Sequence, residues 1–122
     1  MIKINVAEIK KRLVGEKTLA YELSPAELEI TPEELVIDGT VNLEGTMSNA
    51  GDVLLLQAVM TAKVQRTCGR CLKDFTGVAR AEVVEKFYPA SAEHIENDAF
   101  VYDSDVIDIT EPLREGLLLA EP

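Results

Sequence analysis

The chain has no tryptophan, few other aromatic residues and only two cysteines. With so few aromatic side chains, the core must consist mainly of Val, Leu, Ile and Ala. The N-terminus has no continuous apolar segment of the secretory type, so we expect a cytoplasmic protein whose two thiols stay reduced and form no structural disulfide. The longest apolar run, residues 53–56, is far shorter than the ~20 residues that span a bilayer, so no membrane association is expected.

The composition is typical of one globular domain. Hydrophobic residues make up 47% and charged residues 28% of the 122 residues. A chain of this length is too short for two ordinary domains, so we expect residues 1–122 to fold as a single unit.

Acidic residues exceed basic ones, 22 against 12, and the net charge is −10. Such a surface repels phosphate and suits a basic protein partner better than nucleic acid in general. The charge is uneven, however, because no acid occurs between Asp52 and Asp74. Four cations fall in that interval: Lys63, Arg66, Arg70 and Lys73. They are either solvated cations on a sheet face or a local patch that binds an anion such as RNA.

Three long segments alternate between apolar and polar residues: 35–47, 53–67 and 75–88. Alternation with a period of two indicates strands with one buried and one exposed face. In the third segment Phe75, Ala79, Ala81, Val83 and Phe87 fall on the same, apolar side. Short turns join the segments, which predicts an antiparallel meander of long strands that curls into a half-open barrel.

The flanking segments predict shorter elements. Residues 1–5 and 17–23 read as strands, residues 6–13 as a short helix, and residues 100–109 as a returning strand. Asp108 or Thr110 is placed to cap a last helix with an apolar stripe at Ile109, Leu113 and Leu117. The predicted fold class is therefore α+β, with short N- and C-terminal helices around the meander.

Cys68 and Cys71 form a Cys-x-x-Cys turn, which is the one motif with a chemical interpretation. Structural zinc needs four ligands, and the chain has only these two cysteines and His94. Three interpretations remain open: half of a zinc site completed by residues beyond the chain end or by a second molecule, a metal-free structural thiol pair, or a redox motif. A redox pair normally opens a helix after a strand, and this pair joins two strands.

The stretch VQRTCGRCLKDF, residues 64–75, resembles the signature of the YceD family, the large ribosomal RNA subunit accumulation proteins. The alternating segment 36–45, the acidic segment 105–111 and the segment 117–122 are similar to that family as well. Its members typically carry a second Cys-x-x-Cys cluster after the last helix, which this sequence lacks. Either this is a shortened chain or a member without the second pair, so Cys68 and Cys71 carry over only as a zinc half-site. The resemblance implies a bacterial factor required for accumulation of large-subunit ribosomal RNA.

No enzyme active site is expected. His94 lies in an acidic loop and reads as a solvated side chain, and no partner for acid–base catalysis and no small-molecule substrate is indicated. Two function classes remain. One is a non-enzymatic ribosome-assembly factor that contacts RNA through Lys63, Arg66, Arg70 and Lys73. The other is an acidic adaptor that holds a basic ribosomal protein without touching RNA.

Overall fold

The structure is a computed structural model that describes residues 2–12, 15–67, 70, 72–96 and 99–120. Five strands form the main sheet in the spatial order β2-β3-β4-β5-β6. Their bounds are Glu16–Leu23 for β2, Ile37–Asn49 for β3, Leu54–Thr67 for β4, Asp74–Pro89 for β5 and Phe100–Tyr102 for β6. Consecutive strands from β2 to β5 pair antiparallel, and β6 pairs parallel to the end of β5.

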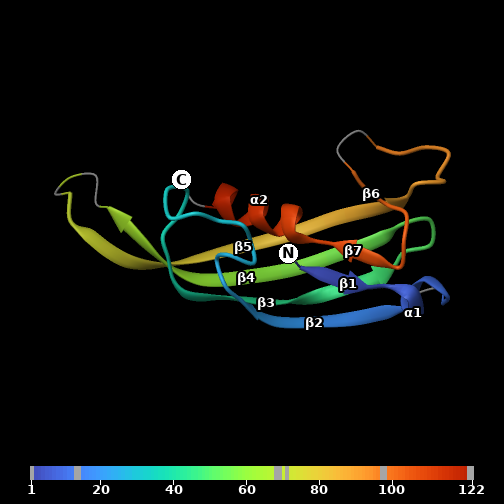
Figure 1. Ribbon diagram of the computed structural model, residues 1–122, viewed down its shortest axis with the longest axis horizontal. Coiled ribbons are helices and arrows are strands. Elements are labelled where there is room, and N and C mark those ends of the chain that lie inside the picture. Colours follow the sequence, from blue (N-terminus) through green and yellow to red (C-terminus); the bar gives the residue numbers. More distant parts are fainter. Residues whose placement is uncertain (1, 13–14, 68–69, 71, 97–98, 121–122) are drawn as a thin grey trace.

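A second layer covers one face of this sheet (Figure 1). It contains the two-stranded sheet of β1 (Lys3–Asn5) and β7 (Val106–Asp108), together with helix α2 (Thr110–Ala120). The short helix α1 (Ala7–Lys10) lies at the end of the sheet where β3 ends and β4 begins (Figure 1). We call the covered face of the main sheet the inner face and the opposite face the outer face.

The core lies between the two layers and consists of aliphatic side chains with a single buried aromatic ring, Phe87. In β4 every even-numbered residue from Leu54 to Val64 is buried, as the alternation of the sequence predicts. The segment 24–35, which is neither strand nor helix, adds Leu28 and Ile30 to the same core. Nothing in the described part of the chain covers the outer face.

The predicted meander of three long antiparallel strands is confirmed, with a register shift between Asp38 and Asn42 of β3. Two extra residues on β3 oppose β4 at this shift. Because two is an even number, the side chains of β3 before and after the shift stay on the same faces of the sheet as an unshifted strand would place them. The sheet is not a closed barrel, since the end strands β2 and β6 do not pair with each other among the described residues.

Two sequence predictions need correction. The N-terminal helix is shorter than the expected 6–13 and spans only Ala7–Lys10. The expected single strand 100–109 is two short strands, because residues 103–105 form a turn that sends β6 to the main sheet and β7 to β1. Ser104 stabilises this turn, since its hydroxyl exchanges hydrogen bonds with the backbone of Val106. No helix of the described residues is long and apolar enough to cross a membrane.

Candidate functional site

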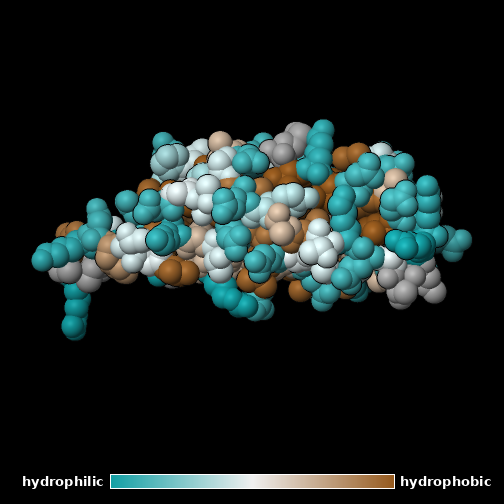
Figure 2. Space-filling view, turned by 90° about the horizontal axis from the view of Figure 1, so that it is seen from below, coloured by the Kyte–Doolittle hydropathy of each residue, from teal (hydrophilic) through white to brown (hydrophobic). Residues whose placement is uncertain are grey.

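The hairpin of β4 and β5 extends beyond the rest of the sheet, at the left of Figure 1. The pairing of β3 with β4 ends at Val64, opposite Ile37, whereas β4 and β5 stay paired up to Thr67 and Asp74. The backbone N–H of Gln65 still donates to the carbonyl oxygen of Val36 at 2.9 Å, and beyond this bond the hairpin is a two-stranded ribbon. We call residues 63–78 the arm. Figure 2 shows hydrophilic side chains at this narrow end of the molecule.

The arm and the remainder of the chain carry charge of opposite sign. Lys63, Arg66, Arg70 and Lys73 contribute +4 and Asp74 contributes −1, which gives the arm +3. Since the whole chain has a net charge of −10, the remainder has −10 − 3 = −13. The hydroxyl of Thr67 also donates a hydrogen bond of 2.8 Å to the Asp74 carboxylate. The carboxylate of the one acidic residue of the arm is therefore held against β4.

The four cations do not form one surface. Lys63 and Arg66 are three residues apart on β4, so their side chains leave opposite faces of the ribbon, Lys63 on the outer face and Arg66 on the inner face. Arg70 lies in the turn and Lys73 just before β5, and both are exposed. The cationic residues that project freely at the tip are thus Arg70 and Lys73.

Arg66 lies against the neighbouring strand instead of projecting into solvent. Its Nη2 donates a hydrogen bond of 3.2 Å to the carbonyl oxygen of Val78. A Cβ on Gly77 would lie only 2.3 Å from Nη1 of Arg66, so the guanidinium occupies the place that a side chain at residue 77 would fill. Arg66 is therefore a residue that ties the two strands of the arm together, in addition to its charge.

Three apolar side chains of the arm are exposed: Leu72, Phe75 and Val78. The sequence alternation placed Phe75 with the buried residues of its strand. It does lie on the inner face, directly opposite Arg66, but it is 50% exposed because the arm extends past the core. The sequence carries a signal for this exposure, since the β4–β5 pattern is longer than the β3 pattern beside it. An aromatic ring next to a guanidinium is thus a surface feature that the sequence reading missed.

Cys68 and Cys71, the predicted zinc half-site, lie outside the described residues. Among the described residues no group of three or more His, Cys, Asp or Glu side chains is placed to hold a metal ion. The one histidine, His94, lines a pocket with residues 50–53, Lys86, Tyr88 and Pro89, at the end of β4 and β5 opposite to the turn that holds Arg70. The zinc half-site at Cys68 and Cys71 therefore stays a prediction.

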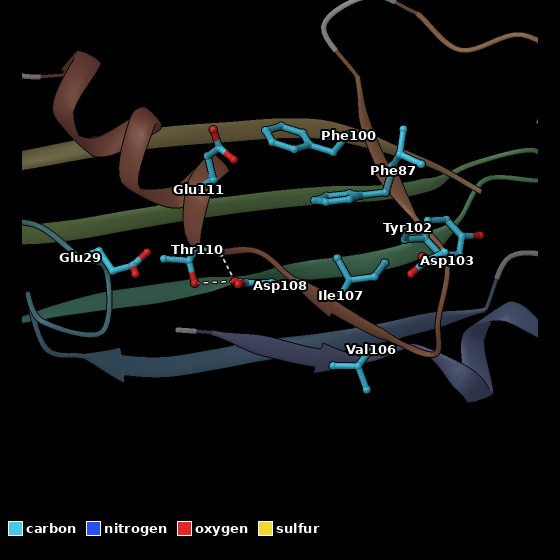
Figure 3. Close-up of a pocket in the computed structure, with 11 residues that line it drawn as sticks. Glu29, Phe87, Phe100, Tyr102, Asp103, Val106, Ile107, Asp108, Thr110 and Glu111 are labelled. Carbon is cyan, nitrogen blue, oxygen red and sulfur yellow. Dashed lines mark hydrogen bonds between the residues drawn. The ribbon is translucent and has the colours of Figure 1, made fainter. Parts of the chain in front are cut away.

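A second candidate site is a pocket of about 390 Å³ between the last strands and the start of α2 (Figure 3). Four carboxylates line it: Glu29, Asp103, Asp108 and Glu111. Its apolar lining includes the stacked rings of Phe87 and Phe100, whose centroids are 5.3 Å apart. We call this the acidic pocket. The sequence pattern predicts a cap at Asp108 or Thr110 and gives no sign of this pocket.

Asp108 is the most strongly engaged carboxylate of the acidic pocket. It accepts hydrogen bonds from the backbone N–H of Thr110, at 2.9 Å, and from its hydroxyl, at 2.5 Å. Desolvation raises the pKa of Asp108, but the hydrogen bonds from Thr110 outweigh it and hold the pKa below its ordinary value of 3.8. The Asp108 carboxylate is therefore an anion at neutral pH and caps the start of α2, as the sequence predicted.

A neighbouring pair of charges ties α1 to the turn between β6 and β7. Lys10 Nζ donates to the Asp105 carboxylate at 2.9 Å and lies 5.5 Å from the ring centroid of Tyr102. The hydrogen bond to Asp105 raises the pKa of Lys10, and the same bond lowers the pKa of Asp105. This cation is thus already paired, and the four carboxylates of the acidic pocket keep their negative field.

The chain has no match among the known proteins that were compared with it. No protein-family model, no curated protein and no solved structure matches the sequence or the fold. Membership of the YceD family, which residues 64–75 resemble, stays a prediction.

Proposed function

We propose that the chain is a non-enzymatic factor of the bacterial cytoplasm that is required for accumulation of large-subunit ribosomal RNA, and that it contacts RNA with the tip of the arm. The observation that supports this proposal is the charge division of the molecule. The arm carries a charge of +3, of which +2 lies in the ribbon that protrudes beyond Val64, and the body carries −13.

The opposite charges of the arm and the body orient the molecule so that the arm faces RNA. Exposed charges act over roughly one Debye length, about 8 Å at physiological ionic strength. A cationic tip that projects beyond the body attracts phosphate, while the body repels it, so RNA contact is confined to the arm. Binding of this kind is weak and local, as expected of a transient assembly factor.

Each exposed group of the arm has a distinct task in this proposal. Arg70 and Lys73 at the tip reach phosphate oxygens, and Lys63 adds charge on the outer face. Phe75 offers a ring on which an unpaired base stacks, and proteins recognise single-stranded RNA largely in this way. Arg66 is the positioning residue that holds β5 against β4 behind that ring.

The experiment is a charge reversal at the tip, Arg70→Glu with Lys73→Glu, tested for binding to fragments of large-subunit ribosomal RNA. We expect a loss of at least tenfold in affinity, because two phosphate contacts become repulsive. The matched control is Lys11→Glu with Arg12→Glu, which changes the net charge by the same amount at exposed positions far from the arm. An equal loss in both variants would mean that only the total charge matters and would refute the arm as the contact site.

The cellular part of the proposal is tested on ribosomal fractions. Depletion of the protein in its own bacterium should selectively reduce the large subunit or accumulate its precursors on a sucrose gradient. The control variant should restore the profile and the tip variant should not. An unchanged profile after depletion would remove the ribosomal role and leave the arm as a binding element for another polyanion.

The second candidate function is the adaptor for a basic ribosomal protein, and the acidic pocket is the observation that favours it. Carboxylates around a partly aromatic pocket suit a lysine or arginine side chain presented by such a partner. This complex would survive nuclease treatment, weaken with salt and weaken further with Asp103→Asn and Glu111→Gln. Loss of the complex on nuclease digestion would rule this candidate out.

A further inference from the structure

Most of β5 lies at an open edge of the main sheet. Of its 16 residues, only Phe87, Tyr88 and Pro89 pair with β6. The remaining 16 − 3 = 13 residues, 74–86, have β4 on one side and no second strand among the described residues (Figure 1). An open strand edge presents unpaired backbone donors and acceptors to a second chain.

Two of the usual protections of an edge strand, a proline and a β-bulge, are missing here. Residues 74–86 contain no proline, and the register with β4 runs without a bulge from Leu54 to Thr67. On the inner face Ala79, Ala81 and Val83 are apolar and buried, and Glu85, opposite Leu56, is the one charged residue of the open edge on that face. Solitary proteins avoid edges of this length and regularity because they pair with other strands.

A groove of about 580 Å³ follows this edge between β5 and helix α2. Its lining includes residues 80–85 of β5 in unbroken sequence, so residues of both faces border it, as expected of a groove at a strand edge. α2 packs closely on the strand, because a Cβ on Gly116 would lie 2.6 Å from Cγ2 of Val83. On the groove side of α2, Leu119 is 84% exposed.

The outer face of the open edge carries a short pattern of four side chains: Val78, Arg80, Glu82 and Val84. Both valines are exposed, at 67% and 62%, although valine in a sheet normally packs against a neighbour. Arg80 Nη1 and the Glu82 carboxylate form an ion pair of 2.6 Å within the chain, with both side chains more than half exposed. The pattern apolar, positive, negative, apolar is complementary to its own reverse.

We propose that two copies of the chain associate through this edge, with their β5 strands antiparallel and the two-fold axis at Ala81. In this register Val78 faces Val84 of the second copy, and Arg80 faces Glu82 of the second copy. The symmetry repeats both pairs, so every outer-face side chain from Val78 to Val84 meets a matching one. The two main sheets then continue as one.

The neighbouring registers are disfavoured by like charges, which makes the assignment specific. In a symmetric pair of β5 strands, facing residues must lie on the same face of the sheet. The two-fold axis therefore always passes through a residue position, and the neighbouring registers place it at Arg80 or at Glu82. An axis at Arg80 places the two arginines opposite each other, and an axis at Glu82 does the same with the two glutamates. Of the axes at residues 79 to 83, only the one at Ala81 pairs opposite charges.

The test is a charge-swap series measured by sedimentation equilibrium: Arg80→Glu, Glu82→Arg, the double swap, and a one-to-one mixture of the two single variants. The wild type should dimerise, and each single variant should weaken dimerisation at least tenfold, because like charges then face each other twice. The double swap should restore the homodimer. The mixture should form a heterodimer, because all facing pairs are then of opposite charge.

Two results would overturn the proposal. One is a wild-type chain that stays monomeric up to the highest soluble concentration. The other is single variants that dimerise as well as the wild type, which would assign the dimer to another surface. Recovery in the mixture also shows that both single variants fold. The tip variant Arg70→Glu with Lys73→Glu should still dimerise, so failure of the RNA proposal and failure of this one are separable.

Discussion

At the scale of single residues, the Asp108–Thr110 contact determines how the last helix starts. The carboxylate accepts from the N–H and the hydroxyl of Thr110, and Thr110 Oγ1 in turn accepts the backbone N–H of Ile2 at 2.7 Å. Thr110 is the one polar residue of the described chain that is fully buried. This chain of hydrogen bonds joins β7, α2 and the N-terminal residues, and it also forms one wall of the acidic pocket.

Replacement of this cap tests the pKa of Asp108. Asp108→Ala should lower the free energy of unfolding by about 1 kcal/mol, the usual effect of losing a helix cap. Because the folded pKa of Asp108 is lowered, its contribution is fully present above the unfolded pKa and is lost as the pH falls through the folded pKa. Urea unfolding from pH 7 downward should therefore converge for wild type and Asp108→Ala in acid. A constant difference at all pH values would contradict an ionised cap.

At the scale of elements, the arm is held by Arg66 and not by a core. Beyond Val64 the ribbon has no third strand, and two-stranded ribbons alone are marginally stable. The guanidinium of Arg66, lying against Gly77, replaces part of the missing packing. We infer that the arm opens at lower free energy than the rest of the sheet.

A double-mutant cycle on Gly77 and Arg66 tests this contact. Gly77→Ala should displace the guanidinium and break its hydrogen bond to Val78, with a loss of under about 1 kcal/mol because the arginine end is flexible. Arg66→Ala should have a similar effect, and the double variant should be no worse than either single one. Hydrogen exchange of amides in the arm is the measurement, since global unfolding will barely change. Additive effects of the two substitutions would mean that they do not act through one contact.

At the scale of the whole molecule, the excess of acidic charge works against the compact state. A net charge of −10 on a chain of 122 residues produces self-repulsion, which salt screens. The body bears more than this excess, since the arm carries charge of the opposite sign. The self-repulsion is therefore concentrated in the body.

Thermal unfolding at different salt concentrations tests the repulsion. At neutral pH the Tm should rise by a few degrees when NaCl increases from about 10 mM to about 150 mM, because the Debye length falls from roughly 30 Å to 8 Å. Near pH 4.5, the sequence pI, the net charge vanishes and this increase should disappear. A Tm that falls with salt at neutral pH would show that attractive ion pairs, such as Arg114 with Glu34, outweigh the repulsion.

The sequence by itself determined the long strands, because a period of two over more than a dozen residues permits no other half-buried structure. It also determined the start of α2 at Asp108 and Thr110, since capping depends on local hydrogen bonds. It indicated four basic residues in an acid-free interval, but not how they are arranged.

Only the tertiary structure decided which faces and edges remain open. Whether Phe75 is covered depends on where β3 ends beside β4, and which of Lys63 and Arg66 lies on the inner face depends on the face that the core occupies. The split of residues 100–109 depends on two different partner strands, β5 and β1. The open edge of β5 follows from the shortness of β6. Contacts between residues far apart in the chain settle each of these features, and a local pattern carries no information about such contacts.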